Sequence, residues 1–158
     1  MRDEVPWLDD QESLAWRGWI DAASVILRLI EQDLKAESGM TFDDYEVLVE
    51  LSESTNRRMR LADLADAVVH SPSRLSQRVD RMAEKGLVRR ERDDDDRRGI
   101  WAVLTDEGLA ILEAAAPAHV VSVRRHLIDR LDRDSIGQLA EILPKLVSDV
   151  RNEAPNEG

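Results

Sequence analysis

The pattern that most restricts the fold of this chain lies in residues 61–86, where two helical segments of unequal length meet at a short interruption. In the first segment, "LADLADAVV", apolar side chains recur at helical spacing. They are Leu61, Leu64, Ala65 and Val68. The interruption "HSP" follows, and two helices joined by a turn of about three or four residues have the proportions of a helix-turn-helix.

The second helical segment begins at this interruption. Ser71 is a favoured N-cap residue, and Pro72 is favoured at the first helical position. The apolar side chains that then recur on one side are Leu75, Val79 and Met82. Gly86 marks the end of the segment, where a glycine commonly follows the last helical turn.

Two short extended runs follow and flank a charged segment. "GLVRRER" (86–92) and "GIWAVLT" (99–105) have strand character, and "DDDDRR" (93–98) lies between them. This predicts a β-hairpin with a charged tip. A calcium loop starting at Asp93 needs glycine sixth and glutamate twelfth, but Arg98 and Leu104 stand there. The metal site is therefore excluded, and a solvated acidic loop is the alternative to a DNA-binding tip.

A long apolar stripe precedes the helix pair. Between Trp16 and Leu34 apolar positions recur in steps of three and four, which predicts a helix of about five turns that ends near Gly39. "TFDD" (41–44) resembles a capping box that opens another helix. "SESTN" (52–56) is predicted to be a turn.

Two further stripes follow the hairpin. Thr105 is expected to cap a fifth helix, Pro117 to kink or break it, and its stripe to continue through Leu131. A last helix follows "DRDS" (132–135), with Pro144 expected to bend it. Its near-heptad spacing suits packing along another helix, within the chain or across a dimer. The alternative is that these stripes form the core of a monomer.

Charge is unevenly distributed along the 158 residues. The net charge is −11, yet residues 55–105 hold 12 Lys and Arg against 9 Asp and Glu. The net charge of the whole chain hides this local positive excess, which favours nucleic acid as a partner. The acidic start and the lack of an apolar run of about 20 residues predict no signal peptide and no membrane span. We therefore expect a cytoplasmic protein.

The sequence resembles the multiple-antibiotic-resistance regulator (MarR) family over roughly residues 12–150. The resemblance is carried by "LADLADAVVHSPSRLSQRVDRMAEKGLVRR" and then by "DDRRGIWAVLTDEG". The second piece matches the family's wing signature of Asp-x-Arg, a hydrophobic strand and Leu-Thr-x-x-Gly. Two departures are Ala62, where the family usually has a Ser or Thr cap, and Pro144 inside the last helix.

The resemblance implies a mainly α fold, in which N- and C-terminal helices form a dimerisation region around a winged helix-turn-helix domain. The expected parts are a flexible arm (1–12), a helical dimerisation region (13–38 and 106–151), the winged helix-turn-helix DNA-binding domain (41–105) and a disordered tail (152–158).

The second helix of the pair is the expected recognition helix. With its apolar side on the core, its polar side chains point outward and can enter the major groove. There Gln77 suits adenine, and Arg74 or Arg81 suits guanine or phosphate. The residues expected to contact DNA are Ser71, Ser73, Arg74, Ser76, Gln77, Arg81, Arg97 and Arg98. The alternative is an ordinary amphipathic helix with a solvated face.

In the wing, Asp96 is expected to orient the arginines of the tip. Arg98, the arginine of the Asp-x-Arg match, is expected to enter the minor groove, where negative potential attracts guanidinium, with Arg97 on phosphate. A homodimer would then bind double-stranded DNA with a pseudo-palindromic site, whose halves lie about 34–36 Å apart, one helical turn.

The resemblance also implies a repressor that a small aromatic or anionic effector releases from DNA. Trp16, Arg17, Trp19 and Tyr45 are candidates for the pocket lining, as aromatic walls with one cation. The alternative is that these aromatic side chains belong to the core. No cofactor and no metal are expected, and the absence of cysteine excludes the thiol chemistry of the family's peroxide sensors.

Two other classes of function were weighed. An enzyme is not expected, because no zinc-binding motif accompanies the three histidines and no nucleophile elbow or phosphate-binding glycine loop is present. A helical protein–protein interaction module that has lost DNA binding is the alternative. It gives no reason for Gln77, Arg97 and Arg98 to be presented together.

Overall fold

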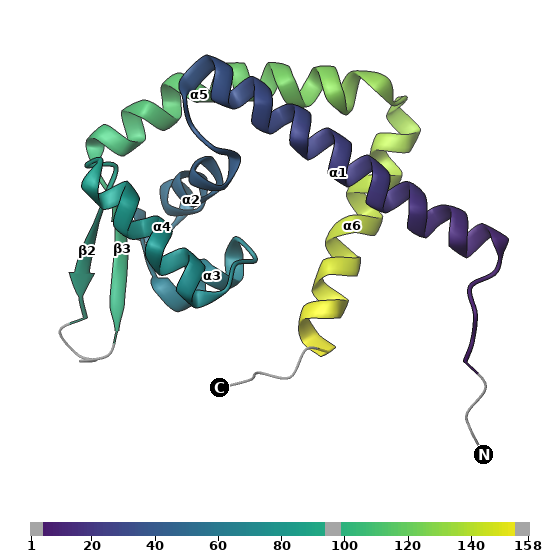
Figure 1. The fold of residues 1–158 in the computed structure, drawn as a ribbon, viewed down its shortest axis with the longest axis horizontal. Helices are drawn as coiled ribbons and strands as arrows, with labels where there is room; N and C mark the ends of the chain where they lie inside the picture. Colours follow the sequence, from purple (N-terminus) through teal and green to yellow (C-terminus); the bar gives the residue numbers. More distant parts are fainter. Residues whose placement is uncertain (1–4, 94–98, 154–158) are drawn as a thin grey trace. The chain divides into compact units, whose positions relative to one another are not determined.

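The computed structural model describes residues 5–93 and 99–153, and this part of the chain is mainly helical (Figure 1). Its α-helices are α1 (Asp10–Ser38), α2 (Phe42–Glu53), α3 (Leu61–Ala67), α4 (Pro72–Glu84), α5 (Asp106–His126) and α6 (Arg133–Glu153). The short 3-10 helices are η1 (Thr55–Arg57) and η2 (Ile128–Arg130). The strands are β1 (Arg58–Arg60), β2 (Val88–Arg92) and β3 (Ile100–Leu104). The chain divides into two compact units, and the boundary in the sequence lies between Ser122 and Val123.

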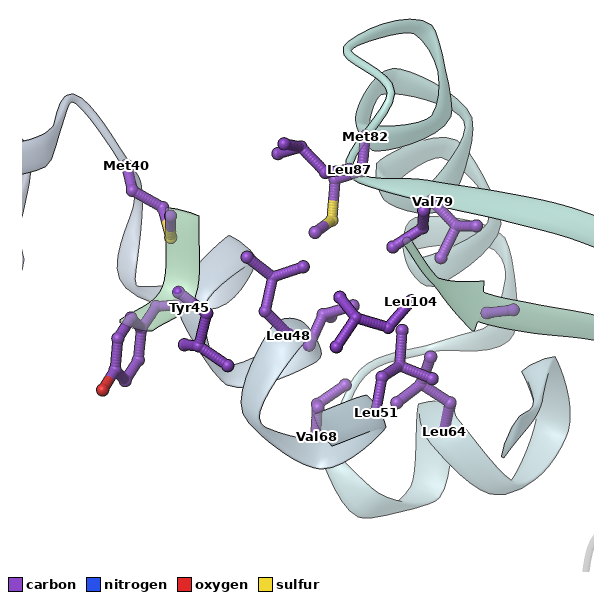
Figure 2. Packing of buried hydrophobic residues seen from close by; sticks show 14 of the residues in the cluster. Met40, Tyr45, Leu48, Leu51, Leu64, Val68, Val79, Met82, Leu87 and Leu104 are labelled. Atoms are coloured by element: carbon purple, nitrogen blue, oxygen red, sulfur yellow. The ribbon is translucent and has the colours of Figure 1, made fainter. Parts of the chain in front are cut away.

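The core of the first unit lies among α2, α3, α4 and the sheet, as Figure 2 shows. The side chains of Leu48, Leu51 and Leu64 are wholly buried there. The residues of α4 that the sequence places inward, Leu75, Val79 and Met82, are at most 1% exposed. The predicted helix-turn-helix and its inward face are therefore confirmed, and so is the mainly α winged-helix architecture.

The described sheet has three antiparallel strands in the order β1-β3-β2. The predicted hairpin is present, with Val88 opposite Leu104 and Arg92 opposite Ile100. Strand β1 was not expected, because the prediction placed a turn at 52–56 and no strand after it. Three residues with two arginines carry no strand signal of their own, and β1 forms because it pairs with the outer edge of β3.

Helix α1 begins earlier than its apolar stripe. Asp9 accepts from the Glu12 backbone N–H at 2.8 Å, and the Asp9 N–H donates to the Glu12 carboxylate at 2.9 Å, which is a complete capping box. Residues 10–12 therefore belong to the helix rather than to the expected arm. At the other end, Gly39 takes the left-handed conformation (φ 70°) in which a helix commonly ends.

The turn between α3 and α4 places a β-branched residue in an unfavourable conformation. Val69 has φ 53°, and the His70 N–H donates to the Ala65 carbonyl at 2.9 Å, which closes the end of α3. Ser71 is the N-cap of α4 as predicted, but its side chain makes no capping hydrogen bond. Its hydroxyl lies 3.4 Å from that of Ser73 instead, so it is not committed to the helix backbone.

The two internal prolines do not break their helices, so of the kink or break expected at Pro117 the break is wrong. Helix α5 runs through it to His126, and α6 runs through Pro144. The proline at 117 removes one hydrogen bond to the carbonyl of Glu113. Glu113 and Pro117 are both exposed residues, so water can donate a hydrogen bond to the Glu113 carbonyl in place of the missing one. The expected continuation of the stripe to Leu131 is also wrong, because the chain forms η2 after α5.

The second unit comprises the end of α5, η2 and α6. The Ser135 backbone N–H donates to the Asp132 carboxylate at 2.7 Å, and this bond holds the pKa of Asp132 below its usual value. An apolar groove of about 280 Å³ is lined by residues that include Leu127, Leu131 and Leu139. Among the residues of known placement, no helix has the length and apolar content to cross a membrane.

Helix α5 approaches the hairpin closely at Gly108. A Cβ there would lie 2.0 Å from the Leu87 carbonyl oxygen, so Gly108→Ala should lower the free energy of unfolding by about 3 kcal/mol. At Gly137 in α6 a Cβ would meet nothing within 4 Å, so Gly137→Ala should raise it by up to about 1 kcal/mol. Urea denaturation of both variants checks this contrast. Equal stability of Gly108→Ala and the parent would contradict the close approach.

Candidate nucleic-acid interface

The outward face of α4 is polar and accessible. Ser73, Gln77 and Arg81 are exposed, directly opposite the buried apolar side of the helix. Ser71 and Arg74 are exposed as well, at the N-terminal end of the helix. The structure therefore brings together five of the residues that the sequence proposes for DNA contact, on one face of a helix whose first turn carries no acidic residue.

Ser76 differs from these five because it is half-buried and already has a partner. Nη1 of Arg90 in β2 donates to Ser76 Oγ at 3.2 Å and also binds the Asp80 carboxylate. Arg90 therefore joins the wing to the recognition helix. This role of Arg90 was not predicted, although strand alternation puts Arg90 on the same face as the buried Val88.

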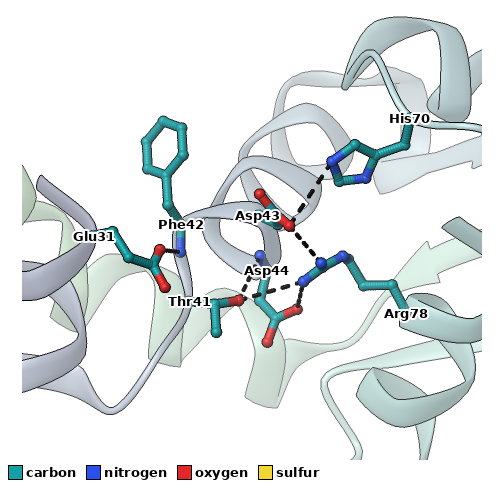
Figure 3. Close-up of polar contacts among 7 residues, drawn as sticks. All are labelled: Glu31, Thr41, Phe42, Asp43, Asp44, His70 and Arg78. Carbon is teal, nitrogen blue, oxygen red and sulfur yellow. Dashed lines mark hydrogen bonds and ion pairs between the residues drawn. The ribbon is translucent and has the colours of Figure 1, made fainter. Parts of the chain in front are cut away.

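Arg78, on the flank of α4, turns inward to a cluster of polar side chains (Figure 3). Its guanidinium binds the carboxylates of Asp43 and Asp44 at the start of α2. Only 14% of its side chain is exposed. The spacing in the sequence did not signal this contact, since the partners lie more than 30 residues away. Arg78 is therefore not available as a surface cation.

The residues proposed at the wing tip, Asp96, Arg97 and Arg98, lie outside the described residues, so their roles stay predictions. At the tip end of the hairpin, directly after β2, Asp93 accepts from Arg60 Nη2 at 2.5 Å and from Trp101 Nε1 at 3.1 Å. The guanidinium of Arg58 stacks 4.2 Å above the Trp101 ring. The first of the four aspartates thus holds strands together rather than facing solvent alone.

A pocket of about 210 Å³ lies beside α2 and includes the aromatic rings of Phe42 and Tyr45. The His119 ring lies 4.4 Å from that of Tyr45, and burial lowers the pKa of His119, so this imidazole is neutral at pH 7. Glu46 and Glu50 also line the pocket. Burial and the charges of Asp43 and Glu50 raise the pKa of Glu46.

Of the four proposed effector contacts, only Tyr45 lines this pocket. Trp16 and Trp19 lie on α1 and are 57% and 49% exposed, and Arg17 is exposed beside them. Neither tryptophan is part of the buried core of the described chain, so the alternative of a core position is wrong for both. Among the described residues, no three His, Asp or Glu side chains are grouped to hold a metal ion.

Comparison with known proteins places this geometry in a family. Residues 38–99 match the model of the MarR family. The transcriptional regulator HosA of Escherichia coli O111:H- is 34% identical over 93 residues, which are 56% of this chain and 62% of HosA. The match thus spans less than two thirds of that curated relative.

Two solved structures are similar over nearly the whole chain. AbsC of Streptomyces coelicolor, a MarR family transcriptional regulator, is 44% identical, with 94% of this chain and 100% of AbsC covered and a TM-score of 0.86. Sco3205 of the same organism, a MarR family transcriptional regulator solved in complex with DNA, is 39% identical, with 94% and 92% covered and a TM-score of 0.87. These relatives are regulators rather than enzymes, in agreement with the missing enzyme motifs. The chain therefore belongs to the MarR family of transcriptional regulators.

Proposed function

We propose that this chain is a dimeric, sequence-specific DNA-binding transcriptional regulator that acts as a repressor. The observation that carries the proposal is the exposed polar face of α4, whose opposite side is packed into the core. A helix anchored in this way can enter the major groove without disturbing the fold. The DNA complex of Sco3205, at 39% identity, supports the same use of the fold here.

The exposed side chains divide by chemistry into positioning and specifying contacts. Gln77 can make a bidentate contact to adenine, and Arg81 to guanine. Ser71, Ser73 and Arg74 lie at the start of the helix, where hydroxyl and guanidinium groups suit phosphate. Arg97 and Arg98, oriented by Asp96, are proposed for the groove beside the wing on the grounds of sequence alone.

Two substitutions on α4 test this division. Gln77→Ala should reduce discrimination at one base pair by about 1–3 kcal/mol while leaving affinity for unrelated DNA unchanged. Arg74→Ala should weaken binding to every duplex and reduce the salt dependence by about one released ion. Gel-shift titration over a range of salt measures both effects. If neither variant differs from the parent, the proposed contacts are wrong. If the parent binds no DNA at low salt, the result favours the alternative of a protein–protein interaction module that has lost DNA binding.

Exposed apolar stripes support the dimer. Trp16, Trp19 and Leu27 of α1 are about half exposed, and so are Ile142 and Leu146 of α6. Each helix leaves these side chains uncovered in its own unit, and large exposed apolar patches mark association surfaces. We propose that a second copy covers them, because the DNA site requires two recognition helices one helical turn apart.

Light scattering tests the dimer at micromolar concentration. The parent should have twice the mass of the chain, and Leu146→Glu should shift it toward the monomer, because a charge placed in an apolar interface is costly. Glu141→Lys changes a charge on the opposite side of the same helix and serves as the control. A monomeric parent would contradict the proposal and remove the half-site argument.

We further propose that a small ligand in the pocket beside α2 lowers DNA affinity. The volume of about 210 Å³ suits a single ring, since drug-sized sites are larger at about 300–1,000 Å³. The lining holds Glu46 and Glu50 but no Lys or Arg among the residues described. The resemblance implies an aromatic or anionic effector, and the charge of the lining favours a neutral or cationic aromatic compound over an anionic one. Arg17, the expected cation, is not among the lining residues.

Thermal unfolding with benzylamine and with benzoate tests this assignment. Benzylamine should raise the melting temperature of the parent, because a ligand that binds only the native state stabilises it. Benzoate should not do so, and Glu46→Gln should lose the response to the amine. Stabilisation by benzoate alone would contradict the proposed ligand class.

A further inference from the structure

The first turn of α2 meets the flank of the recognition helix through a cluster of charged and polar side chains, which we call the Arg78 clamp: Thr41, Asp43, Asp44 and Arg78 (Figure 3). Nη1 of Arg78 donates to Asp44 Oδ1 at 2.5 Å and to Thr41 Oγ1 at 3.3 Å, while Nη2 binds Asp43 Oδ2. One guanidinium thus joins two carboxylates and the N-cap residue of α2.

The Arg78–Asp44 pair of the clamp is largely removed from water, whereas the Asp43 side chain is 40% exposed. Only 14% of the Arg78 side chain and 15% of the Asp44 side chain are exposed. Burying paired charges costs desolvation free energy that their attraction only partly repays, so such pairs are a weak source of stability. They do specify geometry, because the planar fork of arginine binds carboxylates in few orientations. The structural consequence of the clamp is therefore the orientation of α4.

The same turn of α2 is held from its other side by α1. The Phe42 backbone N–H donates to Glu31 Oε2 at 2.5 Å. His70, in the turn before α4, has its Nε2 3.8 Å from Asp43 Oδ2. The start of α2 is therefore a junction that connects α1 to the recognition helix.

A second polar anchor lies on the opposite flank of α4. At 100° per residue, Arg78 falls on one side of the apolar stripe, and Ser76 and Asp80 fall on the other. The latter two bind Arg90 of β2. Apolar packing by itself tolerates rotation of a helix about its axis, whereas two directional anchors on opposite flanks oppose it. The face with Ser73 and Gln77 lies between these anchors.

We propose that Arg78 is a positioning residue for DNA recognition: it does not touch DNA, but through the clamp it fixes the rotation of α4 at which the outward side chains meet the bases. This inference rests on the proposed DNA binding and gives a role to a cation that is too buried to serve as a surface contact for phosphate. It also assigns Asp43 and Asp44 to recognition, although neither can attract DNA.

The direction in which DNA affinity changes in an Asp44 variant distinguishes a positioning role of the clamp from a purely electrostatic one. Asp44→Asn removes a negative charge, which by itself strengthens attraction to DNA. A positioning role predicts instead that the substitution weakens DNA binding. Asp44→Asn and Arg78→Lys should each weaken binding about tenfold to the duplex that the parent selects from a random-sequence library, since one misplaced bidentate contact costs that much. Binding to a scrambled duplex should change less than about twofold.

Glu53→Gln is the matched control, because Glu53 is exposed at the far end of α2 and its side chain forms no ion pair with another residue of known placement. It should not weaken binding to the selected duplex. Fluorescence anisotropy measures all affinities, below the onset of thermal unfolding of each variant. Binding by Asp44→Asn that equals or exceeds that of the parent would overturn the inference.

Salt dependence supplies an independent readout. Arg78→Leu should lower affinity for the selected duplex without changing the slope of log K against log salt, whereas Arg74→Leu should reduce that slope by about one. An equal loss of slope in both variants would make Arg78 a phosphate contact and end the positioning role. If the parent selects no sequence, the proposed function fails as well, which distinguishes that outcome from failure of the clamp alone.

Discussion

The burial of one side of α4 is the interaction on which the rest of this structure depends. Leu75, Val79 and Met82 are at most 1% exposed, and burying three such side chains contributes roughly 5–9 kcal/mol, comparable to the net stability of a whole domain. The same packing leaves the polar side of the helix facing solvent. Stability and the candidate DNA surface therefore lie on opposite sides of one helix.

Ion pairs add the directional contacts that apolar packing does not provide. Arg78 anchors α4 to α2, Arg90 anchors it to β2, and Arg60 binds Asp93 at the tip end of β2. These arginines belong to the segment whose positive excess first indicates DNA. Part of that excess is thus neutralised inside the fold, and the surface available to phosphate is smaller than a charge count implies. The acidic partners of these arginines cancel positive charge and at the same time connect α4 to α2 and β2.

Several local features were predictable because short-range physical chemistry decides them. Gly39 ends α1, Thr105 accepts from the Gly108 N–H at 2.9 Å to begin α5, and the hairpin strands pair as expected. Other local signals failed. Ser71 occupies its N-cap position without the capping bond, and α5 runs through Pro117 although proline cannot donate the helical hydrogen bond. Strand β1 exists only because β3 offers it an edge.

Periodicity along the chain was enough to determine which side of each helix is apolar, since that depends on residues three or four positions apart. Together with the turn residues, it also predicted the helix-turn-helix and the hairpin, and the motifs within them carried the resemblance to the MarR family. Only the tertiary structure decided which charged side chains pair with one another. The carboxylates that hold Arg78 lie 34 and 35 positions away, and no pattern in the sequence distinguishes them from other acidic residues. Periodicity extends over a few turns of one helix, whereas an ion pair between helices depends on where folding brings them together.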